Sequence, residues 1–258
     1  MQPLWFIFYK DKLLLAKQGE KFAVPTGEEA PVGLSKSSSV MEVGTMDDGT
    51  PIKTFALSSP VINDTAFEWI DLRKSFHLLP REHYLKAGKC RELIYWDSNT
   101  QYCGTCGTPL HMHTPISKRC PQCGREIWPA LNPAIIVLVH KGNEALLVHA
   151  RNFKGDYYGL VAGFVETGET LEEAVHREVK EETGIEIKNL RYFGSQPWPY
   201  PCGLMVGFNA DYDGGDIHLQ QSELSKGAWF TKDNLPTIPE PLSIARMILD
   251  DWINKTSI

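Results

Sequence analysis

Residues 163–185 read GFVETGETLEEAVHREVKEETGI, and this stretch is the most informative part of the sequence about the fold. Thr170, followed three residues later by Glu173, forms the pattern of a capping box, which marks the start of a helix. Gly184 stands where a glycine commonly ends a helix. The sequence therefore predicts a helix over Leu171–Thr183.

Two acidic residues fall on the apolar face of this predicted helix. At about 100° per residue, Glu178 and Glu182 lie within the apolar stripe, one turn apart, and Glu181 lies at its edge. The stripe itself consists of Leu171, Ala174, Val175 and Val179. Burying unpaired carboxylates costs several kcal/mol each or forces them to take up a proton, so their position needs a reason.

Bound divalent cations would provide that reason. Mg²⁺ and Mn²⁺ prefer carboxylate oxygens together with water and substrate phosphate. The alternative is a solvated acidic face with Arg177 and Lys180 as partners. That alternative suits the other acidic residues of the segment better, namely Glu172, Glu173 and Glu186. Periodicity alone thus favours Glu178 and Glu182 as metal ligands.

The segment resembles the Nudix box, G-x5-E-x7-R-E-U-x-E-E-x-G-U, in which U is aliphatic. All nine specified positions match: Gly163, Glu169, Arg177, Glu178, Val179, Glu181, Glu182, Gly184 and Ile185. The resemblance implies an α/β/α sandwich that hydrolyses a nucleoside diphosphate linked to another group. It implies that Glu178 and Glu182 hold two or three catalytic Mg²⁺ or Mn²⁺ ions and that Glu181 assists. Glu169 and Arg177 would shape the loop and orient the carboxylates.

A second motif follows, because residues 195–203 read SQPWPYPCG. Prolines that alternate with aromatic residues predict a stiff, extended segment, and taken alone this is a rigid loop. It resembles the S-Q-P-W-P-F-P-x-S array of the NADH pyrophosphatases. Tyr200 replaces Phe and keeps an aromatic ring, whereas Gly203 replaces Ser and lacks its hydroxyl. The resemblance implies substrate binding by Gln196, Pro197, Trp198, Pro199, Tyr200, Pro201, Cys202 and Gly203.

The same resemblance assigns roles to five single residues. The backbone carbonyl of Ala162 and the side chain of Glu223 would bind the catalytic metals. Trp128 and Phe164 would line the nucleotide pocket, and Ala245 would contact substrate. Each has a simpler alternative: the aromatic residues suit a core, and Glu223 suits a surface charge. Glu182 and Glu223 both remain candidates for the general base.

The cysteines indicate a separate metal site. Cys103-x-x-Cys106 and Cys120-x-x-Cys123 are separated by thirteen residues, a spacing that supplies four thiolates in the tetrahedral arrangement that zinc prefers. Each pair is followed by a glycine, Gly107 or Gly124, as expected for a turn with positive φ. Four protein ligands leave no open position, so we expect one structural zinc ion rather than free thiols or disulfides. Cys90 and Cys202 are expected to be ordinary thiols.

Three zones follow from these motifs. Residues 1–98 hold short apolar runs such as Leu4–Tyr9 and 13–16 and the turn-rich stretch 26–39, which predicts a small β-rich domain. Residues 99–128 form a zinc ribbon. Residues 129–258 form the α+β Nudix domain, with a hairpin of strands at 134–140 and 145–149. Further strands are predicted at 160–165, 204–210 and 228–230, and a final helix at 243–255.

Composition limits the class of protein. The 258 residues carry a net charge of −6, which argues against a general nucleic-acid or membrane binder. No apolar run approaches membrane-spanning length, and the default location is cytoplasmic. The resemblance also suggests a homodimer.

The expected reaction is hydrolysis of NADH or NAD⁺ to NMNH or NMN and AMP, with NAD-capped RNA as a second substrate. The rivals are a Nudix hydrolase for ADP-ribose or diadenosine polyphosphates and a non-catalytic nucleotide sensor. A zinc-ribbon nucleic-acid binder is the third rival, and it would use Lys118, Arg119 and Arg125.

Overall fold

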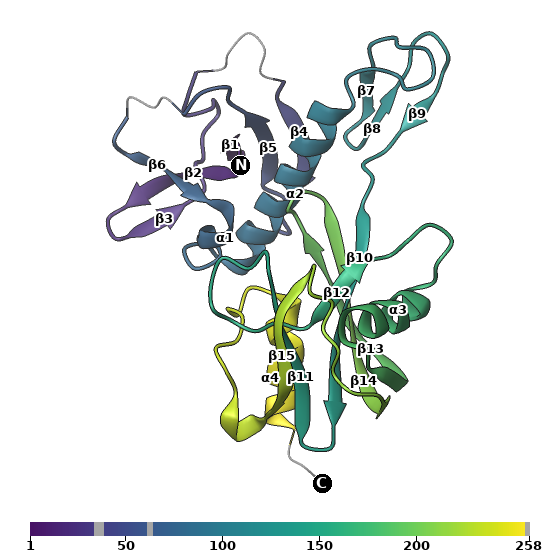
Figure 1. Cartoon of the computed structure of the whole chain (residues 1–258). Coiled ribbons are helices and arrows are strands. Elements are labelled where there is room, and N and C mark those ends of the chain that lie inside the picture. Colours follow the sequence, from purple (N-terminus) through teal and green to yellow (C-terminus); the bar gives the residue numbers. More distant parts are fainter. Residues whose placement is uncertain (34–38, 61–63, 256–258) are drawn as a thin grey trace. The chain divides into compact units, whose positions relative to one another are not determined.

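The structure is a computed structural model that describes residues 1–33, 39–60 and 64–255. The chain divides into two compact units (Figure 1). The first comprises Met1–Ala130 together with Pro199–Cys202, and the second comprises Leu131–Trp198 and Gly203–Ile258. Part of the turn-rich stretch 26–39, residues 34–38, lies outside the described residues.

A six-stranded sheet forms most of the first unit, as expected for a β-rich domain. Its order is β3-β2-β1-β5-β4, and β6 pairs with β2. The apolar run Leu4–Tyr9 is the central strand β1, which pairs antiparallel with β2 and parallel with β5. The other strands are β2 Lys12–Gln18, β3 Lys21–Ala23, β4 Met41–Thr45, β5 Pro51–Ala56 and β6 Phe67–Asp71.

Two helices follow this sheet, α1 (Leu72–Ser75) and α2 (Arg81–Asn99). The 19-residue helix α2 corrects the prediction that residues 1–98 hold only short strands and loops. Its buried residues do not form an apolar stripe, since they include a glycine and two aromatic residues with polar tips, and the periodicity that identifies a helix is weak there. These residues are Tyr84, Ala87, Gly88, Cys90, Leu93 and Trp96.

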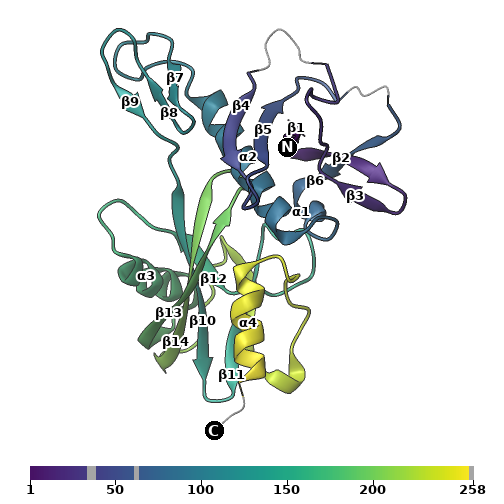
Figure 2. The same ribbon diagram turned by 180° about the vertical axis from the view of Figure 1, so that it is seen from behind.

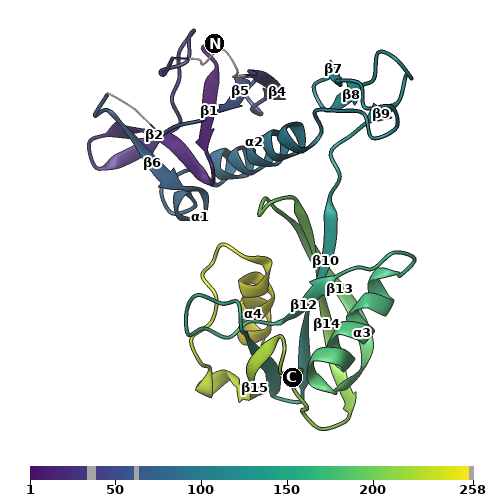
Figure 3. The same ribbon diagram turned by 45° about the horizontal axis from the view of Figure 1, so that its top comes forward.

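The cysteine-rich segment comes directly after α2 (Figure 3). It folds into a small antiparallel sheet of β7 (His111–Thr114), β8 (Ser117–Arg119) and β9 (Glu126–Ile127). Its core is small, and consists of Cys103, Leu110 and Cys120 with Ile127 packed against them. So small a core is typical of domains that depend on a metal ion.

The second unit contains a mixed sheet in the order β13-β14-β10-β11-β15, with β12 paired to β10. The predicted hairpin at residues 134–149 is confirmed, since β10 and β11 are antiparallel neighbours, and β10 also runs parallel to β14. The bounds are β10 Asn132–Lys141, β11 Glu144–Ala150, β12 Val161–Phe164, β13 Glu186–Trp198, β14 Gly203–Gly214 and β15 Leu224–Thr231.

Helices cover both faces of this sheet (Figure 2). Alternate residues of β10 point to opposite faces, so that Ile135 packs with α3 (Leu171–Thr183) and Ile136 packs with α4 (Ile244–Asn254). A short 3₁₀ helix, η1 (Lys232–Asn234), precedes α4. The result is the expected α/β/α sandwich. Within the described residues, no helix has the length and apolar character needed to cross a membrane.

Candidate active site

The ends of helix α3 are fixed by local interactions that the sequence predicts. The Thr170 hydroxyl accepts a hydrogen bond from the Glu173 amide at 3.2 Å, and the Glu173 carboxylate accepts one from the Thr170 amide at 2.8 Å. At the other end Gly184 has φ 74°, a conformation that glycine adopts without strain. The predicted bounds of the helix are confirmed.

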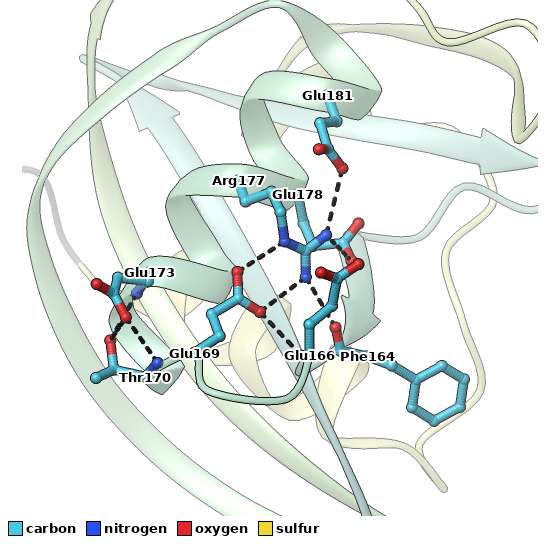
Figure 4. A network of polar contacts seen from close by, with 8 residues as sticks. All are labelled: Phe164, Glu166, Glu169, Thr170, Glu173, Arg177, Glu178 and Glu181. Carbon is cyan, nitrogen blue, oxygen red and sulfur yellow. Dashed lines mark hydrogen bonds and ion pairs between the residues drawn. The ribbon is translucent and has the colours of Figure 1, made fainter.

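Arg177 ties this helix to the loop that precedes it (Figure 4). Its guanidinium donates two hydrogen bonds to Glu169, at 2.7 and 3.0 Å, and one to the Phe164 carbonyl at 2.9 Å. It also reaches Glu178 at 2.8 Å and Glu181 at 3.3 Å. The hydrogen bonds from Arg177 hold the pKa of Glu169 below its ordinary value. The Arg177 guanidinium therefore holds the loop and three of the Nudix-box carboxylates, those of Glu169, Glu178 and Glu181.

Gly163 leaves the space that the Glu178 carboxylate occupies. A Cβ atom at position 163 would overlap the carboxyl group of Glu178. Gly163 pairs with Ile135 in the register of β12 and β10, so its backbone is held in place by the sheet. Any larger residue at position 163 would displace the Glu178 carboxylate from this place.

The carboxylates on the buried face of α3 are electrostatically unfavourable in the absence of a cation. Glu182 is 4% exposed and Glu178 is 9% exposed, which confirms the prediction from periodicity. Burial, together with the nearby charges of Glu178 and Glu223, raises the pKa of Glu182 to about 8. Burial also raises the pKa of Glu178, although Arg177 opposes this. Among the described residues, no Lys or Arg forms an ion pair with Glu182.

Glu223 reaches this cluster from the loop before β15. Its side chain is exposed but lies within hydrogen-bonding reach of Glu182. The loop is held against the end of α3 because the Gln220 amide donates a 2.9 Å hydrogen bond to the Glu182 carbonyl. Glu181 instead points toward Arg177 with half of its side chain exposed. Ala162 lies in β12, opposite Ile136.

This donor set fits hard divalent cations. The oxygens of the three glutamates, residues 178, 182 and 223, do not form a tight group of the kind that the cysteines form within the described part of the chain. Mg²⁺ usually keeps several water ligands and binds through one or two carboxylates plus phosphate, so spaced carboxylates suit it. The residues present can therefore bind such ions and neutralise the buried negative charge.

The residues of the S-Q-P-W-P-Y-P-C-G array form a hairpin rather than a straight segment. The array is extended up to Trp198, the end of β13, and it resumes at Gly203, the start of β14. The intervening Pro199–Cys202 turns, so the expectation of an extended array is wrong there. A Cβ at Gly203 would lie 3.2 Å from the Trp198 carbonyl, so this chain leaves little room for the serine of the related array.

Gln196 has a structural use that the sequence does not indicate. Its buried side-chain amide donates to the Leu242 carbonyl at 2.9 Å, and its oxygen accepts a hydrogen bond from the Ile244 amide at 2.6 Å. Gln196 thereby holds the start of α4. Ala245, in the first turn of that helix, is 7% exposed.

The turn Pro199–Cys202, here called the tip of the array, belongs to the first unit. There it contacts two residues that no sequence motif indicates. The hydroxyls of Tyr200 and Tyr84 lie 3.0 Å apart, and the Arg73 guanidinium lies 4.1 Å from the centre of the Tyr200 ring. Burial is the largest cause that raises the pKa of Tyr200. The remaining array residues are the exposed Pro197 and Pro201 and the buried Pro199 and Cys202.

Two aromatic residues assigned to the nucleotide pocket are available to a ligand. Trp128 is 57% exposed and Phe164 is 64% exposed, so neither belongs to the core of its own unit. Their exposed ring faces are free to stack on a planar ligand.

The four cysteines come together as the spacing predicts. Their sulfur atoms all lie within 4.8 Å of one another, with Cys103 and Cys123 3.6 Å apart and Cys106 and Cys120 3.5 Å apart. The glycines that follow each pair have φ near 74°. Backbone amides of Thr105 and Cys106 lower the pKa of the Cys103 thiol to about 6, which favours the thiolate form that binds metal. The cluster can hold a metal ion, and four thiolates are the donor set that zinc prefers.

Comparison with known proteins accounts for both units. Residues 130–250 match the NUDIX domain family, and residues 2–96 match the NADH pyrophosphatase-like rudimentary NUDIX domain. The NAD-capped RNA hydrolase NudC of Deinococcus radiodurans is 38% identical over 253 residues, 96% of this chain and 86% of that protein. The chain belongs to the NudC family of Nudix hydrolases.

Other members of the NudC family agree. NudC of Shigella dysenteriae is 36% identical over 250 residues, 96% of this chain and 92% of that protein. NudC of Chromobacterium violaceum is 43% identical over 185 residues, 71% of this chain and 70% of that protein. The crystal structure of a Nudix hydrolase from Nitrosomonas europaea, at 20% identity, covers 60% of this chain and 90% of its own with a TM-score of 0.52, which supports the fold.

One feature of this NudC-family chain weakens the rival interpretation as a nucleic-acid-binding zinc ribbon. Lys118 is 2% exposed, forms an ion pair with Asp97 at 2.6 Å, and donates to the Thr100 carbonyl at 2.8 Å. It thus joins the ribbon to the end of α2 and is not available to a phosphate backbone. Of the two remaining basic residues, Arg125 donates to Thr105 at 2.7 Å, which leaves Arg119.

Proposed function

We propose that this chain hydrolyses the pyrophosphate bond of NADH or NAD⁺ to NMNH or NMN and AMP. The 5′ end of NAD-capped RNA contains the same bond, and its hydrolysis would give NMN and 5′-monophosphate RNA. The observation that carries the proposal is the buried position of Glu182 beside Glu178 and Glu223, because a bound cation allows this cluster to stay ionised where burial otherwise favours protonation. The names of the NudC relatives support the choice of substrate.

Glu178, Glu182, Glu223 and the Ala162 carbonyl would hold two or three Mg²⁺ or Mn²⁺ ions. Such ions, when bound, neutralise pyrophosphate oxygens and lower the pKa of a water molecule. Arg177 keeps Glu178 and Glu181 in place through its hydrogen bonds. Either Glu182 or Glu223 accepts the proton of the attacking water, and separate glutamine variants distinguish the two.

Substrate recognition would use the residues that the resemblance assigns to binding. Phe164 and Trp128 offer exposed rings on which a base or a nicotinamide ring can stack. The array would contribute Gln196, Pro197, Trp198, Pro199, Tyr200, Pro201, Cys202 and Gly203, and Ala245 would add a small contact at α4.

The proposal extends to the domains of the chain, its oligomeric state and its location. Residues 1–98 would form the N-terminal domain, 99–128 the ribbon with one structural zinc ion, and 129–258 the catalytic domain. The resemblance to the NADH pyrophosphatases suggests a homodimer, which light scattering on the purified protein would test. None of the six cysteines, all of which the structure describes, forms a disulfide, and we propose the reducing cytoplasm as the location.

The test is a substrate panel in Mg²⁺ or Mn²⁺ with product identification by mass spectrometry. NADH, NAD⁺ and NAD-capped RNA should be cleaved at the pyrophosphate, and faster than ADP-ribose or diadenosine tetraphosphate. Glu182→Gln should abolish turnover, whereas Glu172→Gln on the exposed side of α3 should not. Faster turnover of ADP-ribose would refute the choice of substrate. Binding without turnover by the wild-type protein would indicate a nucleotide sensor.

A further inference from the structure

One face of helix α2 carries the tip of the array. Residues four apart on a helix lie on the same face, and residues 84, 88 and 92 form such a row. Tyr84 contacts Tyr200 through the two hydroxyls, 3.0 Å apart. One turn further on, Gly88 lies against the ring of Pro199. After another turn comes Glu92; burial, and after it the charge of Glu92, raise the pKa of Cys202.

Gly88 is explained by this contact. Glycine is disfavoured in the interior of a helix, and residue 88 lies in the middle of the 19-residue α2. A Cβ at this position would be 3.1 Å from Cγ of Pro199, closer than ordinary van der Waals contact. Glycine therefore provides the space into which Pro199 packs.

A second element of the same unit holds Tyr200 from another direction. Arg73 lies in α1, whose first turn is capped by the side chain of Asp71. The Arg73 guanidinium sits 4.1 Å from the centre of the Tyr200 ring, within the range of a cation–π interaction. Tyr200 is thus held at its hydroxyl by one helix and at its ring by another.

These contacts reach the rest of the array through the chain itself. Trp198 and Gly203, which flank the tip, are paired residues at the end of the β13–β14 hairpin. Only four residues, Pro199–Cys202, connect them. Because so short a connection leaves little freedom, a tip fixed on α2 restricts the conformations of the flanking residues.

We propose that Tyr84, Gly88 and Arg73, here called the α2 latch, are positioning residues for the substrate-binding array. The first unit, which carries the latch, would then contribute to dinucleotide binding by fixing the conformation of residues 195–203. The inference rests on the proposed function, because it assumes that the array contacts the dinucleotide. A latch of this kind affects how well substrate binds and leaves the chemistry at Glu178 and Glu182 unchanged.

The test compares KM and kcat for NADH among latch variants. Tyr84→Phe and Tyr200→Phe each remove one hydroxyl from the shared contact, and each should raise KM by about two- to tenfold, the value of one hydrogen bond. The double variant should be no worse than either single variant, because both remove the same contact. Gly88→Leu, which displaces Pro199, should raise KM by more than about tenfold. In every case kcat should stay within about twofold of the wild type.

Tyr102→Phe is the matched control. Tyr102 belongs to the same unit, but it lies outside α2 and is 67% exposed, so the KM of this variant should equal that of the wild type. An unchanged KM in both single hydroxyl variants would overturn the proposal. A loss of kcat that parallels a loss of thermal stability would also overturn it, because the latch would then be a structural contact only.

Failure of the proposed function gives a different result. If the wild-type protein cleaves another dinucleotide but not NADH, the substrate assignment fails. The same variants are then compared on the dinucleotide that is cleaved, and the latch predicts the same rise in KM for it.

Discussion

Replacing Glu182 by glutamine should make the protein inactive and, without divalent cations, more stable at high pH. The substitution preserves the shape of the side chain but removes the charge. Burial and the charges of Glu178 and Glu223 raise the pKa of Glu182 from 4.5 to about 8 in the folded protein. Between these two values the folded protein keeps a proton that the unfolded chain loses. Folding then takes up a proton, and stability falls as the pH rises.

The size of the effect follows from the two pKa values. Each pKa unit corresponds to about 1.4 kcal/mol, so a rise from 4.5 to about 8 corresponds to roughly 5 kcal/mol above pH 8. Glutamine does not titrate and lacks this contribution. The difference in unfolding free energy between Glu182→Gln and wild type should therefore be small near pH 4.5 and grow to a few kcal/mol in favour of the variant at pH 9.

Urea denaturation from pH 5 to 9 measures this difference, in buffer freed of Mg²⁺ and Mn²⁺ but with the zinc content verified. Added Mg²⁺ should stabilise the wild type at pH 9 more than the variant, because only the wild type has the full set of carboxylates. The reasoning is refuted if the two proteins show the same pH dependence, or if the wild type is the more stable one at pH 9.

Three further perturbations test other parts of the structure. Gly163→Ala places a methyl group where the Glu178 carboxylate lies, so kcat for NADH should fall by about 100-fold while circular dichroism shows an intact fold; near-normal kcat would contradict the close packing. Lys118→Met leaves Asp97 without its buried partner and should lower the unfolding free energy by about 3 kcal/mol in urea, whereas a change below about 1 kcal/mol would mean that the ion pair is dispensable. Cys103→Ser should reduce the zinc content from about one ion per chain to none, measured by atomic absorption, and a retained ion would contradict the four-thiolate site.

The sequence predicts best what short-range interactions determine. The bounds of α3 follow from Thr170, Glu173 and Gly184, all of which act within one turn of the helix ends. The burial of Glu178 and Glu182 follows from the same helical geometry. The cysteine cluster requires only two tight turns and four thiolates that suit one metal, so the spacing of the cysteines is sufficient to predict the cluster.

Contacts between distant parts of the chain cannot be predicted from such short-range patterns. Helix α2 lacks an apolar stripe because Tyr84 and Gly88 meet a loop that comes more than a hundred residues later; the two tyrosine hydroxyls are 116 positions apart. Gln196 has a polar side chain of the kind that binds substrates, yet its side-chain amide forms hydrogen bonds with backbone groups at the start of α4. The sequence also gives no sign that Lys118, a charged residue, is buried by Asp97 and the carbonyls at the end of α2.

Hydrolysis of NADH in ¹⁸O-labelled water, with products identified by mass spectrometry, tests the central claim most directly. A metal-dependent attack of water on the pyrophosphate predicts NMNH and AMP in equal amounts, with a total of one ¹⁸O atom in the two product phosphates and no reaction when Mg²⁺ and Mn²⁺ are absent. Release of free nicotinamide, or intact NADH under conditions in which ADP-ribose is consumed, would contradict it.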